Sequence, residues 1–141
     1  MRIALLLTTA LAVLTACSGG GAERGGTLAK TQFLSAIQVV PAPMRTGSTG
    51  APIVGLVVSG TITNDGSSAL ECTRSNFVLV SPAESDVAPT AEFCALPSIP
   101  PKQSAYFNAT FAAPPRDDWK LRFEHGDGSY EVHDLNVPPA G

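Results

Sequence analysis

Short apolar segments, separated by stretches rich in proline and glycine, constrain the fold of this chain more than any other feature. The clearest is segment 53–63 (IVGLVVSGTIT), in which alternate positions of an extended strand would face a core: Val54, Leu56, Val58, Gly60 and Ile62. Hydroxyl side chains alternate with them at Ser59, Thr61 and Thr63. A period of two residues, with many β-branched side chains, is typical of a half-buried β-strand. The NDGSS stretch that follows predicts a turn, because Asp65-Gly66 supplies a position with positive φ.

Similar segments recur along the rest of the chain. We expect further strands within residues 31–40, 69–73, 76–80, 91–96, 105–111, 119–125 and 129–137. The first should end before Pro41, and segment 97–104 (PSIPPKQS) is too rich in proline for a central strand. In segment 105–111, Phe107 and Phe111 should point inward. The chain carries 13 glycines and 12 prolines, and no later segment has a convincing helical period. Residues 28–141 are therefore predicted to form one all-β sandwich of about seven strands.

The last two strands can be aligned residue by residue. If Asp127-Gly128 forms a two-residue turn, Phe123 pairs with Val132. The core face then holds Leu121, Phe123, His125, Tyr130 and Val132, and the solvent face holds Lys120, Arg122, Glu124, Glu131 and His133. This register puts the two histidines on opposite faces, where they could not share a metal ion or form a relay. A change of parity after Val132 predicts a bulge or a strand end near Asp134.

The first sixteen residues have a different character. Met1-Arg2 is followed by an unbroken run of apolar and small residues from Ile3 to Ala16. A positive start, an apolar run and small residues before a cut site are typical of a secretory signal peptide. The run is about 14 residues long, whereas a helix that spans a membrane needs roughly 20. We therefore expect residues 1–16 to be removed as a signal peptide.

The end of that segment, Leu14-Thr15-Ala16-Cys17, resembles the bacterial lipobox. The resemblance implies that Cys17 becomes the N-terminal residue and carries acyl chains on its sulfur and its amine. More than one chain makes a durable membrane anchor, because each buried methylene contributes on the order of 0.8 kcal/mol. The glycine-rich residues 17–27 are then a flexible tether, and the protein faces the periplasm or the exterior from the cell envelope. A soluble secreted protein, in which Cys17 is incidental, is the alternative.

Lipidation of Cys17 would leave Cys72 and Cys94 as an even pair in an exported chain, where disulfides form and persist. Closing the loop between them stabilises the fold by on the order of 3 kcal/mol in the chain-entropy model. A metal site is the competing interpretation, since Glu92 lies near Cys94. No CxxC or HxxxH spacing occurs, however, and we expect a Cys72–Cys94 disulfide and no metal ligand.

Neither the charge nor the motifs of the sequence indicate nucleic-acid binding, catalysis or calcium binding. The formal net charge is −3 and only 15% of residues are charged, so no basic patch for nucleic acid is expected. No G-x-S-x-G nucleophile motif is present, and HGDGS lacks the oxygen ligands of an EF-hand. Asp117-Asp118 should form a polar turn before Trp119. The sequence predicts no catalytic residue and no cofactor.

Three segments carry recognisable motifs: GTITNDGSSAL (60–70), NFVLVSP (76–82) and IPPKQSAYFNATF (99–111). Together they resemble a family of small immunoglobulin-like domains in bacterial envelope proteins, the FxLYD-type and related extracellular lipoprotein domains. In segment 60–70 (GTITNDGSSAL), Gly60, Ile62 and Asn64 match the family's G-x-V-x-N strand and turn. Segment 76–82 (NFVLVSP) is similar to its F-x-L strand, and segment 99–111 (IPPKQSAYFNATF) to its P-P-G-x-S-x-x-F strand, with Lys102 in place of the usual glycine. The resemblance implies an immunoglobulin-like sandwich, a non-catalytic module of the envelope, and no catalytic residues.

Two classes of function remain. The first is a non-catalytic binding or structural module on a lipid tether, which presents loops such as 44–52 and 81–90, or an edge strand, to an envelope protein. The second is a small hydrolase or metal-dependent enzyme, whose site the fold would have to assemble. A cluster of His, Asp and Ser side chains in one pocket would favour the second class.

Overall fold

The computed structural model describes residues 25–44 and 53–139. The predicted signal peptide (1–16), the predicted lipidation site Cys17 and residues 18–24 of the predicted tether lie outside the described residues. So does residue range 45–52, which holds most of the first candidate contact loop. Within the described part of the chain, no helix has the length and hydropathy needed to cross a membrane.

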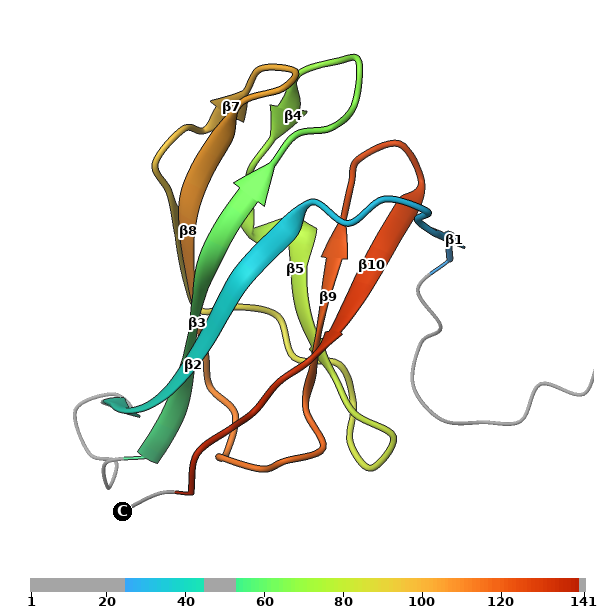
Figure 1. The fold of residues 1–141 in the computed structure, drawn as a ribbon. Helices are drawn as coiled ribbons and strands as arrows, with labels where there is room; N and C mark the ends of the chain where they lie inside the picture. Colours follow the sequence, from blue (N-terminus) through green and yellow to red (C-terminus); the bar gives the residue numbers. More distant parts are fainter. Residues whose placement is uncertain (1–24, 45–52, 140–141) are drawn as a thin grey trace, which may run out of the picture.

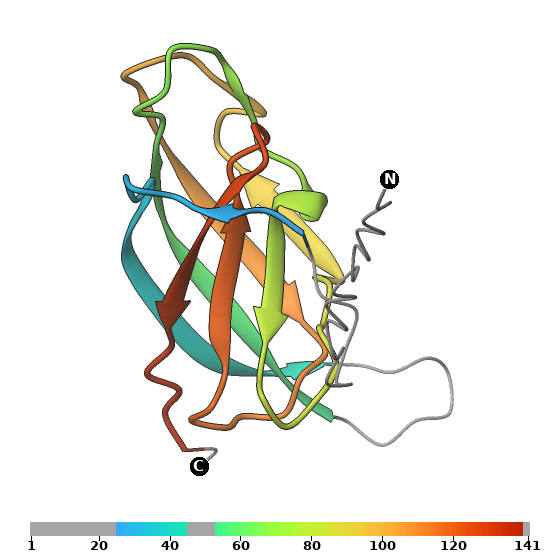
Figure 2. The same cartoon turned by 90° about the vertical axis from the view of Figure 1, so that its right-hand side faces the viewer.

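Two four-stranded sheets pack face to face (Figures 1 and 2). The first has the order β2-β3-β8-β6, with bounds Leu34–Met44, Ile53–Thr63, Ser104–Phe111 and Ala91–Cys94. The second has the order β1-β10-β9-β5, with bounds Thr27–Leu28, Ser129–Asp134, Lys120–Glu124 and Phe77–Val80. Apart from β1, these strands follow in chain order the A-B-E-D and C-F-G arrangement of a constant-type immunoglobulin domain. The predicted all-β sandwich is confirmed, and β1 adds a short parallel pairing to β10.

Three short elements lie beside the main sheets. Strands β4 (Leu70–Glu71) and β7 (Ser98–Ile99) pair with each other, and the 3₁₀ helix η1 (Arg74–Asn76) leads into β5. Both short strands stand at one end of the sandwich, beyond the end of β3 and near the turn between β9 and β10 (Figure 1). This end carries the connections that correspond to the B–C and F–G loops of an immunoglobulin domain.

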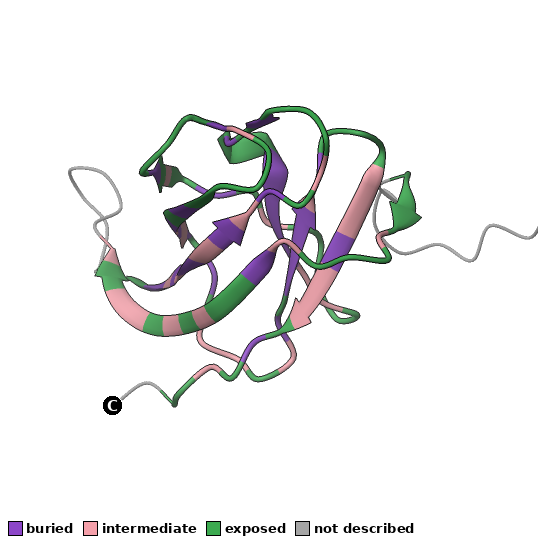
Figure 3. Cartoon of the chain, turned by 45° about the horizontal axis from the view of Figure 1, so that its top comes forward, coloured by how far each residue is buried: buried purple, intermediate pink, exposed green. Residues whose placement is uncertain are grey.

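Aromatic rings from both sheets fill the space between them, where the buried residues gather (Figure 3). The ring centroid of Phe77 lies 5.0 Å from that of Phe107 and 5.1 Å from that of Phe123, so three rings join the two sheets. Phe107 and Phe111 are buried, as predicted. Val54 was predicted to face the core but is 41% exposed. The pairing of β3 with β8 begins at Leu56, so Val54 lies outside the stretch that β8 flanks and less of the sandwich covers it.

Strand β2 does not end before Pro41 as predicted. It continues through Pro41 and Pro43 to Met44, paired with β3 throughout this stretch. Strand β2 is an edge strand, with β3 as its neighbour on one side, and the two prolines occupy alternate positions along it. Proline cannot donate a hydrogen bond, which an edge strand tolerates where its N–H would face solvent. The strand is irregular between Ser35 and Gln38, where Ala36 has a φ of 52°.

The predicted disulfide between Cys72 and Cys94 is confirmed. Their Cα atoms lie 6.2 Å apart, within the usual range for a disulfide, and both residues are buried. The bond connects the residue after β4 to the last residue of β6. It therefore ties the segment that leads into η1 to the outer strand of the first sheet.

Loss of this disulfide should destabilise the fold. We expect the double variant C72A/C94A to lose about 3 kcal/mol in free energy of unfolding, because the bond closes a loop in the unfolded chain. Urea denaturation of the wild type with and without dithiothreitol should show the same difference. The double variant serves as the control, since reductant should leave its midpoint unchanged. Equal midpoints for the oxidised wild type and the variant would contradict the prediction.

Candidate functional site

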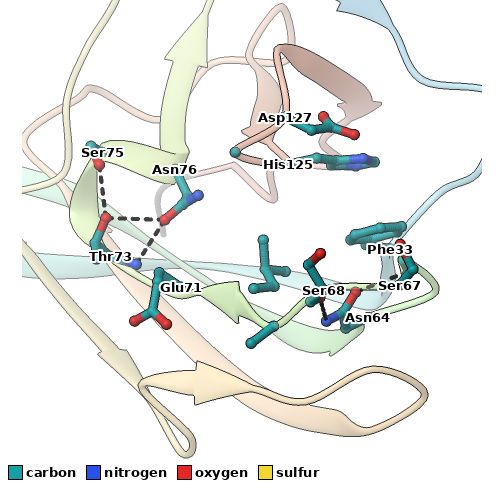
Figure 4. Close-up of a pocket in the computed structure, with 14 residues that line it drawn as sticks. Phe33, Asn64, Ser67, Ser68, Glu71, Thr73, Ser75, Asn76, His125 and Asp127 are labelled. Carbon is teal, nitrogen blue, oxygen red and sulfur yellow. Dashed lines mark hydrogen bonds between the residues drawn. The ribbon is translucent and has the colours of Figure 1, made fainter.

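A pocket of about 610 Å³ opens at the end of the sandwich that carries β4 and the β9–β10 turn. Phe33 and three segments line it. The segments contribute residues 64 and 66–71, residues 73, 75 and 76, and residues 125–127. Figure 4 shows them as three groups around one space, with His125 and Asp127 facing Asn64 and Ser68 on one side and Thr73, Ser75 and Asn76 on another. The site is thus built from connections of one end of the fold.

Asn64 holds the first wall. Its side chain is buried, and its amide donates to the carbonyl oxygens of Ser68 and Ile99, each at 2.8 Å. Its Oδ1 atom accepts from the backbone N–H of Gly66 at 2.9 Å, which closes the predicted turn after β3. Its own carbonyl accepts from the N–H of Lys102 at 2.7 Å, and Lys102 has a φ of 64°. A left-handed backbone favours glycine, so Lys102 occupies a conformation that other residues rarely adopt.

Asn76 holds the second wall. Its Oδ1 atom accepts from the backbone N–H of Thr73 at 2.8 Å and caps η1. Its amide donates to the carbonyl of Glu124 at 2.8 Å, which fixes η1 against the end of β9. The second wall is thereby connected to the strand from which the third wall begins.

The β9–β10 turn forms the third wall, and it holds three residues rather than the predicted two. His125 N–H donates to Ser129 O at 2.9 Å, so Gly126, Asp127 and Gly128 make up the turn. Both glycines have positive φ, 84° and 89°, a conformation that other residues rarely adopt. The extra residue shifts the register, and Glu131 instead of Val132 lies opposite Phe123. A shift of one residue moves every side chain of a strand to the other face.

The predicted faces of β10 are therefore wrong. Glu131 and His133 point inward on the same side as Phe123 and His125, while Tyr130 and Val132 belong to the outer side. The two histidines were predicted to lie on opposite faces and to be unable to act together. In the structure, both ring Nε2 atoms contact one carboxylate.

That carboxylate belongs to Glu131, whose side chain is only 2% exposed. One oxygen contacts His125 Nε2 at 2.7 Å and accepts from the backbone N–H of Phe33. The other contacts His133 Nε2 at 2.8 Å and accepts from Leu34 N–H at 2.6 Å. Two backbone donors and two imidazoles thus surround one buried carboxylate, which meets the requirement that a buried charge be hydrogen-bonded.

His125 connects this network to the pocket. Its ring stacks on that of Phe33, with centroids 3.9 Å apart and planes 9° from parallel. Its Nδ1 atom lies 3.3 Å from Ser129 Oγ. Both His125 and Phe33 line the pocket, so the wall they form is fixed from behind by Glu131.

The lining of the pocket is acidic and rich in hydroxyl groups. Glu71 and Asp127 bring two carboxylates, and hydroxyls come from Ser67, Ser68, Thr73 and Ser75. Among the residues that the structure describes, no Lys or Arg side chain lines the pocket. Asp127 has its pKa lowered from the usual range, chiefly by the Ser129 hydroxyl and also by the Ser129 backbone N–H. The pocket therefore suits a neutral polar or cationic ligand better than an anion.

The remaining predicted features fall elsewhere. Asp117-Asp118 lies in a polar turn before the buried Trp119, as predicted, and Asp118 pairs with Arg116 there. Loop 81–90 lies at the opposite end from the pocket, where Ser81 Oγ bonds Asp118. Within residues 25–44 and 53–139, no group of three His, Cys, Asp or Glu side chains is arranged to hold a metal ion.

Sequence reasoning missed Glu131 because its side chain was assigned to solvent. One signal could have found it: glycines on both sides of Asp127 allow a three-residue turn as well as a two-residue one. Comparisons of the chain with family models, with characterised proteins and with solved structures found no match.

Removal of the Glu131 charge should destabilise this end of the fold. We expect E131Q to lose about 3 kcal/mol in free energy of unfolding. The NH₂ group of glutamine cannot accept a hydrogen bond, so a group that now donates to a Glu131 oxygen would lose its acceptor. The matched control is D134N, the same change on the same strand at a side chain that is 84% exposed. Its loss should stay below about 1 kcal/mol. If chemical denaturation gave equal losses of stability for E131Q and D134N, the buried network would contribute no more to stability than an exposed carboxylate does.

Asp127 should titrate below the usual carboxyl range. Because the fold lowers its pKa, ionised Asp127 stabilises the turn above the unfolded pKa, about 3.9, and this stabilisation is lost as pH falls through the lower folded pKa. NMR titration of the side-chain carboxyl carbon should show a rise toward the unfolded value in S129A. Asp134, whose pKa is lowered by Lys120, provides the control and should not respond. An unchanged Asp127 midpoint in S129A would refute the role of the Ser129 hydroxyl.

Proposed function

We propose that this protein is a lipid-anchored, non-catalytic binding module of the bacterial cell envelope, and that the pocket beside His125 is its recognition site. The observation that carries the proposal is the construction of the pocket. Asn64, Asn76 and Glu131 each fix one wall through buried or partly buried hydrogen bonds. Recognition residues often lie on loops that a rigid scaffold positions, and small ligands bind in preformed concave sites.

The position of the pocket agrees with that role. The connections that line it correspond to the B–C and F–G loops, which carry recognition in immunoglobulin variable domains. The resemblance of segments 60–70, 76–82 and 99–111 to FxLYD-type envelope domains supports a non-catalytic module. The lipobox-like sequence that ends at Cys17 supports a membrane anchor.

The anchor and the pocket would lie at the same end of the molecule. Thr27 N–H donates to Gly128 O at 3.0 Å, so the described chain begins beside the β9–β10 turn. From Cys17 to Gly25 an extended chain reaches at most about 30 Å. Lipidation at Cys17 would therefore hold the pocket near the membrane surface, within reach of an envelope protein embedded there or lying on it.

Site-specific photo-crosslinking in intact cells would test the binding role. A photo-reactive residue at Ser67, an exposed residue of the pocket lining, should capture one reproducible envelope protein. The same residue at Ser85, exposed in the loop at the opposite end, is the control and should not capture it. Equal capture from both positions, or none from Ser67, would overturn the pocket as recognition site.

Mass spectrometry of the mature protein would test the anchor separately. We expect an N-terminal Cys17 that carries acyl chains, and release of the C17A variant into the soluble fraction. An unlipidated start at Cys17, or a start further along the chain, would refute the anchor and leave the crosslinking result to stand by itself.

A hydrolase is the second candidate, and one set of contacts favours it. Ser129 Oγ, His125 and Glu131 form a hydroxyl–imidazole–carboxylate chain, with distances of 3.3 Å and 2.7 Å. These are the residue types of nucleophilic catalysis. We prefer the binding module because Ser129 Oγ hydrogen-bonds Asp127 at 2.5 Å and Ser129 is not among the residues that line the pocket.

A further inference from the structure

The two outer faces of the sandwich differ in charge. On the outer side of β9 and β10, Lys120 pairs with Asp134, and Arg122 pairs with Glu124 while its guanidinium lies 3.6 Å from the ring of Tyr130. The outer side of the β2-β3-β8-β6 sheet is different. Among the described residues that are paired between these four strands, none with an outward-facing side chain is charged. The two faces therefore offer different chemistry to their surroundings.

Two large aromatic side chains stand on the uncharged face. Phe93 on β6 is 58% exposed and Tyr106 on β8 is 48% exposed. Phe93 pairs with Asn108, and Ala95 N–H bonds Tyr106 O, so the two aromatic residues are diagonal neighbours on adjacent strands. Diagonal positions on one face are about 7–8 Å apart. Contiguous exposed apolar area is a common feature of interaction surfaces.

Polar groups without a protein partner surround these rings. Across the rows of the sheet, Ser59 pairs with Asn108 and Thr61 with Tyr106. Among the described residues, the side chains of Ser59, Thr61 and Asn108 make no hydrogen bond within the protein. Hydroxyl and amide groups, donors and acceptors at once, are therefore free to bind a ligand beside the aromatic rings.

We propose that this face binds a neutral glycan, with Phe93 and Tyr106 stacking on pyranose rings and Ser59, Thr61 and Asn108 bonding sugar hydroxyls. A pyranose offers C–H groups on its flat side and hydroxyls at its rim, which match an aromatic platform bordered by hydroxyls and an amide. Charge complementarity favours this occupant, because an anionic polymer or an acidic lipid surface would find no Lys or Arg on the aligned strands. The proposal is independent of the pocket proposed above.

The test uses the full mature chain in detergent and a panel of soluble oligosaccharides. Chitohexaose, cellohexaose and maltohexaose are the neutral probes, and oligogalacturonate is the anionic one, with affinity measured by calorimetry at low and high salt. We expect at least one neutral hexasaccharide to bind with a salt-independent Kd, and oligogalacturonate not to bind. F93A and Y106A should each weaken binding about tenfold, because an aromatic anchor is removed.

The matched controls separate this site from the rest of the protein. K120A, on the charged outer face, and S67A, in the pocket, should bind the same hexasaccharide with unchanged affinity. Thermal melting should show that F93A and Y106A remain folded, as expected for exposed side chains. Absence of binding by all three neutral probes at millimolar concentration, or equal binding by F93A and wild type, would overturn the proposal. So would concentration-dependent dimers in sedimentation that F93A abolishes, because they would assign the face to a second copy of the chain.

Discussion

The carboxylate of Glu131 is the interaction on which the arrangement of this sandwich depends most. Moving a carboxylate from water into a protein interior costs several kcal/mol unless hydrogen bonds compensate. Here they come from both sheets: Phe33 and Leu34 at the start of β2, and His125 and His133 on the β9–β10 hairpin. The same side chain therefore closes the sandwich at one edge and positions the His125 wall of the pocket.

The network also explains why the hairpin holds its register. With the two-residue turn, Glu131 would point to solvent and the N–H groups of Phe33 and Leu34 would lose their acceptor. A one-residue slip is normally opposed by moving apolar side chains into water. In β10 the inward residues are Glu131 and His133, so a prediction from hydrophobic alternation assigns the wrong side chains to the core. Hydrogen bonds to the buried carboxylate select the observed pairing instead.

This contrast shows which parts of the molecule its sequence can predict. Segment 53–63 was predictable because Leu56, Val58 and Ile62 obey a two-residue period and are all buried. The Cys72–Cys94 bond followed from counting cysteines in a chain predicted to be exported. The path of β2 through Pro41 depends on its place at a sheet edge, which is a tertiary property. The pocket could not be predicted, because its lining comes from the β3–β5 connection and the β9–β10 turn, which meet only once the strands are paired.

The uncharged sheet face poses a stability problem that the charged face does not. Edge strands and flat uncharged sheets invite association with other chains, and charged side chains are a common protection. Strand β2 is instead protected by Pro41 and Pro43, which cannot donate to an added strand, and by the irregularity at Ala36. Strand β6, at the other edge, is short, with bounds Ala91–Cys94. Neither protection places a charge on the outer face. In the described part of the chain, the paired positions of that face therefore carry no Lys, Arg, Asp or Glu and suit a neutral partner.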